Sequence, residues 1–171
     1  MPINVEIKAK CSNQDNIRNI LKSKSARFIG IDHQIDTYFK VNHGRLKLRE
    51  GNIENHLIYY ERQDTAGPKK SEVNLYKTEP GSPLKEILSK LFDILVVVDK
   101  QREIYFIDNI KFHIDTVNNL GSFIEIEAID TNGNIGIDKL TQQCEHFLTL
   151  FEIQQQDLVS PSYSDLLLQT T

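Results

Sequence analysis

The sequence predicts an α+β fold in which amphipathic helices pack on an antiparallel sheet. Eight short segments rich in β-branched and aromatic residues are separated by turns that contain Gly, Pro and Asn. Three other segments repeat apolar residues at helical spacing. Such helices need a sheet face to cover. With 171 residues the chain has the length of one domain, so we expect a single domain over residues 1–171.

The strands are expected to follow one another as hairpins. Gly44, Gly51 and Gly133 mark three of the turns, since glycine adopts turn conformations at little cost. We expect strands over residues 3–11, 28–41, 45–50, 56–63, 71–79, 95–107, 110–117 and 122–130.

The helices have recognisable starts. Ser12 can cap the first, and Ser82 followed by Pro83 begins the second, as an N-cap and a first-turn proline should. A last short turn is expected from Ser162 to Asp165. The third helix has an apolar stripe made of Ile137, Leu140, Cys144, Phe147, Leu148 and Phe151.

Composition excludes several classes of protein. Lys and Arg number 20 against 24 Asp and Glu, a net charge of −4, whereas a general nucleic-acid binder is normally basic. Cys11 and Cys144 cannot form a disulfide framework, which favours a reducing compartment. The longest apolar run, residues 94–98, is too short to cross a membrane, and the first residues lack the pattern of a secretory leader. We therefore expect a soluble cytoplasmic protein that binds neither nucleic acid nor membrane.

Five of the predicted strands have one apolar and one ionic face. Side chains alternate across a strand, so Glu6 and Lys8 share a face, as do Glu125 and Glu127. Two geometries account for this pattern. The ionic face is either the solvated side of an open sheet or the lining of a barrel whose apolar faces carry the helices.

The barrel interpretation has a consequence for the ligand. The ionic faces hold seven cations against four anions, an excess of three. A triphosphate with about four negative charges, bound together with a divalent cation, would roughly balance that excess. Carboxylate oxygens suit Mg²⁺ or Mn²⁺ better than zinc. The cations are Lys8, Arg45, Lys47, Arg49, Lys100, Arg102 and Lys111, and the anions are Glu6, Asp115, Glu125 and Glu127.

Several motifs carry a family resemblance. Asn4-Val5-Glu6-Ile7-Lys8 resembles the N-terminal Glu-x-Glu-x-Lys signature of the CYTH superfamily, the triphosphate tunnel metalloenzymes. The resemblance continues in the family's order to about residue 168. Segments 36–39, 44–50, 58–62, 120–127 and 162–167 are similar to the CyaB-like branch, or class IV adenylyl cyclases.

The resemblance implies an eight-stranded antiparallel β-barrel, a tunnel that binds a triphosphate end-on with Mg²⁺ or Mn²⁺, and helices outside. It implies catalytic roles for Glu6, Lys8, Asp115, Glu125 and Glu127, of which the four carboxylates would be the metal ligands. Arg45 would lie at the tunnel mouth, and on the fourth strand either Glu61 or Arg62 would point inward. The phosphate ligands would be Lys8, Lys47, Arg49, Lys77, Lys100, Arg102 and Lys111.

Three functions remain open at this point. The first is an adenylate cyclase that converts ATP to cyclic AMP and pyrophosphate. The second is a triphosphatase acting on thiamine triphosphate, tripolyphosphate or a nucleotide. The third is a module that binds a nucleotide or polyphosphate without turnover, because Asn4 replaces the first Glu of the signature and removes one negative charge. The partner is in each case a small triphosphate, and the resemblance also implies a homodimer.

Overall fold

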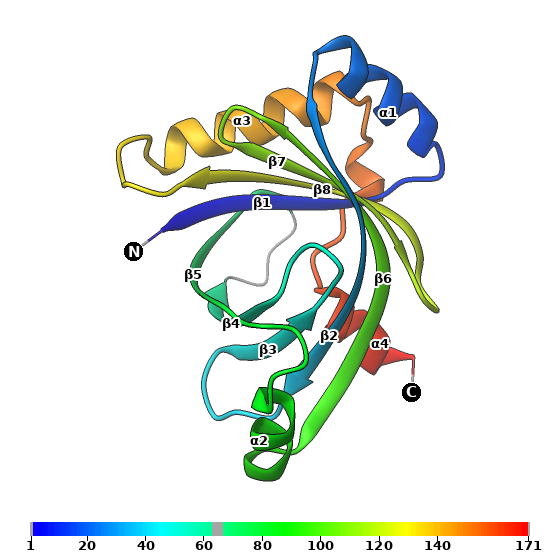
Figure 1. The fold of residues 1–171 in the computed structure, drawn as a ribbon. Coiled ribbons are helices and arrows are strands. Elements are labelled where there is room, and N and C mark those ends of the chain that lie inside the picture. The colour runs from blue at the N-terminus through cyan, green and yellow to red at the C-terminus, as the bar shows by residue number, and fades with distance from the viewer. Residues whose placement is uncertain (1, 63–66, 171) are drawn as a thin grey trace.

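A computed structural model describes residues 2–62 and 67–170, with the side chain of Arg62 outside the description. Eight antiparallel strands close into a barrel in the order β1-β5-β4-β3-β2-β6-β7-β8 (Figure 1). The expected eight-stranded barrel is confirmed, and the open sheet is excluded. The strands are β1 (Ile3–Lys10), β2 (Arg27–Phe39), β3 (Arg45–Glu50), β4 (His56–Arg62), β5 (Lys69–Lys77), β6 (Ile94–Ile107), β7 (Ile110–Val117) and β8 (Gly121–Asp130).

Strand β1 closes the ring. It pairs with β8 over its whole length, from Ile3↔Asp130 to Lys10↔Phe123, but with β5 over four residue pairs, from Ile3↔Glu72 to Glu6↔Lys69. These last pairs explain why β5 begins at Lys69 rather than at the expected residue 71. The end of the strand expected over 56–63 cannot be compared, since residue 63 lies outside the described residues.

The apolar faces of β1, β7 and β8 point outward and form the main core with two helices. These helices, α1 (Gln14–Ser23) and α3 (Ile137–Leu150), lie across that part of the barrel (Figure 1). Phe112 of β7 is fully buried there, and its ring contacts those of Phe147 and Phe151 at centroid distances of 4.8 and 5.7 Å. Burial of a side chain of this size contributes about 1.5–3 kcal/mol, so this core holds the ionic faces toward the lumen.

Two further helices pack at the other end. In α2 (Leu84–Leu91), Leu88 packs with Phe39 and Leu48. The expected last turn is instead a capped helix, α4 (Tyr163–Gln169), which follows the 3-10 turn Gln155–Asp157. No helix in the described ranges is both long enough and apolar enough to span a bilayer.

The helix starts differ slightly from those expected. The cap of α1 is Asn13 rather than Ser12, because the Asn13 side chain accepts a hydrogen bond from the amide of Asn16 at 3.3 Å. In α2 the N-cap position falls on Pro83, one residue after the expected Ser82. At α4 the expected start is confirmed: Ser162 and Asp165 form a reciprocal capping box.

Candidate functional site

The ionic strand faces enclose a cavity of about 350 Å³ inside the barrel. All eight strands contribute to its lining, together with the β3–β4 loop and the start of α4. Its acidic, basic and amide side chains come from Asn4, Glu6, Lys8, Asp36, Lys47, Arg49, Glu54, His56, Asn74, Lys100, Arg102, Lys111, His113, Glu125 and Glu127.

One side of the cavity, which we call the basic wall, consists of Asp36, Lys47, Arg49 and Lys100 on β2, β3 and β6. The Arg49 guanidinium donates two hydrogen bonds to Asp36, both of 2.8 Å, and Lys100 donates a third of 2.8 Å. Lys47 lies 3.5 Å from the same carboxylate. Burial alone would raise the pKa of Asp36, but Arg49 and Lys100 hold it well below its usual range.

Lys100 is the most strongly perturbed cation of the basic wall. Burial of its ammonium, together with the neighbouring Arg102 and Arg49, lowers its pKa to about 7, although Asp36 opposes the shift. Lys100 therefore changes charge near neutral pH, unlike an ordinary lysine.

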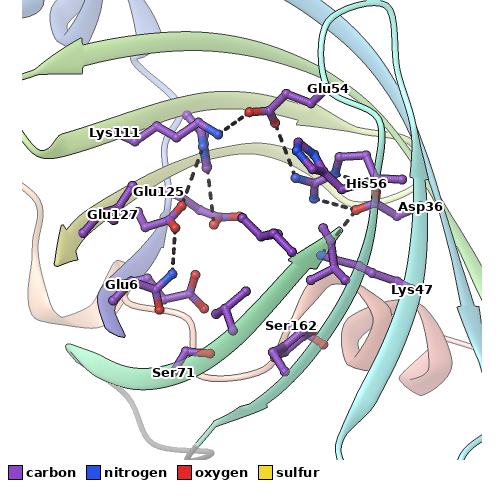
Figure 2. A pocket seen from close by; sticks show the side chains of 18 of the residues that line it. Glu6, Asp36, Lys47, Glu54, His56, Ser71, Lys111, Glu125, Glu127 and Ser162 are labelled. Atoms are coloured by element: carbon purple, nitrogen blue, oxygen red, sulfur yellow. Dashed lines mark hydrogen bonds and ion pairs between the residues drawn. The ribbon is translucent and has the colours of Figure 1, made fainter. Parts of the chain in front are cut away.

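The opposite side, which we call the acidic wall, consists of Asn4, Glu6, His113, Glu125 and Glu127 on β1, β7 and β8. The register places Glu6 beside Glu127 and His113 beside Glu125. Asn4 Nδ2 donates to Glu127 Oε1 at 2.7 Å. Figure 2 shows Glu6, Glu125 and Glu127 of this wall close together at one side of the cavity.

His113 lies between the two glutamates. Nδ1 is 3.7 Å from Glu125 and Nε2 is 4.0 Å from Glu127, both too long for hydrogen bonds. Within the described residues neither ring nitrogen has a hydrogen-bond partner, and the same is true of Asn4 Oδ1. Burial and Arg102 lower the pKa of His113, which keeps the imidazole neutral at physiological pH.

Arg102 joins the acidic wall to a deeper carboxylate. It donates two hydrogen bonds of 2.8 Å to Asp115 and one of 3.1 Å to Glu125. Asp115 also accepts a 2.7 Å hydrogen bond from Tyr163 Oη, is fully buried and does not line the cavity. Its role as a metal ligand stays a prediction, and in this arrangement its oxygens face Arg102 and Tyr163.

The acidic wall matches a divalent cation in the chemistry of its donors. Glu6, Glu125 and Glu127 supply carboxylate oxygens, and Asn4 Oδ1 is a buried acceptor without a partner in the described part of the chain. As the side chains lie, no three His, Cys, Asp or Glu residues in the described ranges are grouped closely enough to hold an ion. Binding of one cation by all three carboxylates therefore requires side-chain movement.

Of the other predicted cations, Lys8 lines the cavity, whereas Arg45 and Lys77 do not. Lys8 donates to the carbonyl of Pro161 at 2.9 Å and lies over the Tyr163 ring, at the cavity wall. Arg45 is bonded to Asp165 of α4 at 2.8 Å and does not line the cavity. Lys77 lies at the exposed end of β5, outside the cavity lining.

The open choice on β4 is partly resolved. Glu61 is exposed and accepts a 2.7 Å hydrogen bond from Tyr59 Oη, so it does not point into the tunnel. The Arg62 side chain lies outside the described residues.

Two carboxylates of the cavity were missed by the sequence analysis. Asp36 shares its strand face with Tyr38, and this alternation could have placed it inside. Glu54 lies in a loop, where no periodicity predicts direction. Six cations and five carboxylates line the cavity in the described ranges, so the expected excess of three positive charges is corrected to one.

One flank of the cavity is apolar. It combines residues of β1 and β8 with residues of β4 and β5, and Leu75 is 62% exposed, which opens this flank to solvent. The strand pattern did not reveal this surface. Its members are Ile3, Ile58, Tyr60, Val73, Leu75 and Ile129.

Comparisons with known proteins agree with this architecture. A protein of Methanocaldococcus jannaschii named as a putative adenylate cyclase is 28% identical over 96% of this chain and 98% of its own. The solved structure of the PH1012 protein from Pyrococcus horikoshii superposes with a TM-score of 0.81 at 23% identity, over 95% of this chain and 98% of that one.

A Hippeastrum protein, described as a putative adenylyl cyclase with a dominant triphosphatase activity, has a TM-score of 0.68 at 13% identity, over 100% of this chain and 97% of its own. These two structural likenesses establish the fold alone. The family model of the CYTH domain matches residues 2–163, so the chain belongs to the CYTH family, as its motifs indicated.

Proposed function

We propose that this protein processes a nucleoside triphosphate in its tunnel with a divalent cation, and that the reaction is the cyclisation of ATP to cyclic AMP and pyrophosphate. The proposal rests chiefly on one observation: a wall of oriented cations faces a wall of carboxylates across a cavity of about 350 Å³. A phosphate chain and its counter-cation need these two surfaces side by side.

The cations would bind and orient the phosphate chain. Arg49 and Arg102 are each fixed by a bidentate pair with a carboxylate, which pre-sets their direction before ligand arrives. Lys47 is held by Tyr38 Oη at 3.2 Å. Cations held in this way stabilise the charge that develops on a leaving pyrophosphate without reorganising during the reaction.

The carboxylates would hold the cation. Glu6, Glu125 and Glu127 are the proposed ligands, with Asn4 Oδ1 as a neutral donor. A bound Mg²⁺ or Mn²⁺ supplies Lewis-acid stabilisation to phosphoryl oxygens. The neutral His113 between Glu125 and Glu127 adds no positive charge that would compete with the cation.

The apolar flank favours an organic triphosphate over inorganic tripolyphosphate. Ile3, Val73 and Ile129 offer no partner to a phosphate, but they can cover a base or another ring system. The relative from Methanocaldococcus jannaschii, which matches over 96% of this chain, supports the cyclase by its name.

A triphosphatase is the second candidate, and the Hippeastrum structure is the observation that favours it, since its description reports that activity as dominant in a similar fold. The two reactions use the same walls. They differ in whether the 3′-hydroxyl attacks the α-phosphorus or water attacks the terminal phosphorus.

The deciding experiment is ³¹P NMR of the protein with Mg²⁺ or Mn²⁺, supplied in turn with ATP, thiamine triphosphate and tripolyphosphate. Pyrophosphate and a cyclic-nucleotide signal from ATP would support the cyclase. Orthophosphate with a diphosphate product would replace it by a triphosphatase and identify the substrate. Line broadening without products would leave a binding module and overturn both enzymatic proposals.

A further inference from the structure

The β3–β4 loop places a carboxylate across the lumen of the tunnel. Glu54 is bound by Lys111 of β7 through its Oε2, while its Oε1 accepts a 3.0 Å hydrogen bond from Gln34 Nε2 and lies 3.5 Å from Arg49 Nη1 of β3. Strands β3 and β7 are not neighbours in the barrel, so this bridge crosses the cavity (Figure 2).

The loop is anchored by the barrel beneath it. The amides of Ile53 and Glu54 both donate to the fully buried Asp32 at 2.9 Å. Gln34 donates to the same carboxylate at 2.8 Å. A Cβ at Gly51 would lie 2.6 Å from Asp32 Oδ1, so glycine is needed for this close approach. Glu54 is therefore held in position by an anchored loop.

Lys111 and Arg49 are two of the cations expected to bind phosphate, and a carboxylate already lies between them. Burial alone would raise the pKa of Glu54, but these two cations hold it far below its usual range. The group is thus an anion at any physiological pH. A phosphate at the same position would either displace it or lie beside a like charge.

We infer that Glu54 is a specificity-determining residue: an internal anion that fills one phosphate position of the tunnel and makes it select short phosphate chains over longer ones. The inference rests on the proposed function. A longer polyphosphate needs one more site that can accept an anionic phosphate group. The site between Lys111 and Arg49 is already occupied by the Glu54 carboxylate.

The test compares the binding of tripolyphosphate and tetrapolyphosphate by calorimetry, with Mg²⁺ and, to prevent cleavage, with EDTA. In the wild type, tetrapolyphosphate is expected to bind no more tightly than tripolyphosphate, despite its greater charge. In Glu54→Gln, the affinity for tetrapolyphosphate relative to tripolyphosphate should rise about tenfold, because a like charge has left the lumen.

Two further variants make the test specific. Glu50→Gln removes the same charge from the outer face of β3, where Glu50 pairs with Lys85 at 3.2 Å, and should leave the ratio unchanged. Glu54→Asp keeps the charge and should retain the wild-type ratio within about threefold. Melting temperatures establish that each variant is folded.

An unchanged ratio in folded Glu54→Gln would overturn the inference and leave the proposed function intact. Weaker binding of both chains would also overturn it, since Glu54 would then be organising the cations. No binding of either chain by any of these proteins, with or without Mg²⁺, would overturn the proposed function and this inference together.

Discussion

The basic and acidic walls of the tunnel satisfy their buried polar groups to different degrees. In the basic wall, Asp36 is paired with Arg49, Lys100 and Lys47, so each charge has a partner inside the protein. In the acidic wall, His113 and Asn4 Oδ1 are buried without hydrogen-bond partners in the described ranges.

The cations of the basic wall, which we propose to bind phosphate, therefore also serve as scaffold, whereas the acidic wall has bonding capacity left for a ligand. Buried polar groups are nearly always hydrogen-bonded, so atoms left without a partner indicate a place where a ligand or water completes the bonding. The basic wall is complete without a ligand and stabilises the barrel. The acidic wall is incomplete, and we expect its substitutions to affect function more than folding.

The largest effect is expected at the acidic wall. Glu127→Gln should reduce turnover at least about a hundredfold, since a proposed cation ligand loses its charge. Stability should change little, because within the described residues the carboxylate has one hydrogen bond, from Asn4, and the side chain is 19% exposed. The measurements are ³¹P product formation and thermal melting, and a wild-type rate would exclude Glu127 from the metal site. Glu61→Gln, on the outer face, is the matched control.

The next largest effect is expected in the basic wall, where a substitution should reduce stability rather than turnover alone. Asp36→Asn should lower the free energy of unfolding by about 3–5 kcal/mol, because Arg49 and Lys100 lose their buried counter-ion. Urea unfolding measures the loss. As a control, Glu86→Gln breaks the exposed pair with Lys90 on α2 and should cost no more than about 0.5 kcal/mol. A stable Asp36→Asn protein would show that the basic wall is not a scaffold.

A smaller effect is expected from the titration of Lys100, whose pKa of about 7 lies in the accessible range. An anionic ligand favours the charged form of Lys100. Above pH 7, where Lys100 of the free protein is largely neutral, ligand binding must therefore be accompanied by uptake of a proton. Triphosphate affinity should therefore be full below pH 7 and fall as the pH rises above it. Calorimetry in EDTA from pH 6 to 9 measures this. Lys100→Arg, which stays charged, should flatten the profile, and an unchanged slope would exclude Lys100 as its source.

The sequence predicted the strands within about two residues, because alternation and turn residues mark both the face and the ends of a strand. The two-residue alternation also predicts that Glu6, Lys8 and Glu127 lie on the ionic face of their strands, and all three line the cavity in the structure. Alternation could not decide whether that side faces water or a lumen. The family motifs indicated that this side faces a lumen, and the closed barrel of the structure confirms it.

Where the structure places a predicted residue outside the cavity lining, or lines the cavity with one that was not predicted, the cause is local. Lys77 has the inward parity of Val73 and Leu75, but β5 ends there beyond the cavity. Asp115 is on the ionic face, yet Arg102 and Tyr163 bind it behind the lining. Glu54 reaches the lumen through a loop anchored by Asp32, and such a contact depends on tertiary structure that no strand pattern encodes.

The smallest effect is expected from restoring the signature residue. Asn4→Glu replaces the amide that donates to Glu127 by a carboxylate, so it adds a negative charge beside the proposed ligands. Cation affinity should rise about threefold to tenfold, as ligand charge sets affinity in oxygen sites. Electron paramagnetic resonance of free Mn²⁺ measures it, with Asn132→Glu, on an exposed turn, as the control. Turnover that appears in Asn4→Glu and is absent from the wild type would identify the natural protein as a binding module.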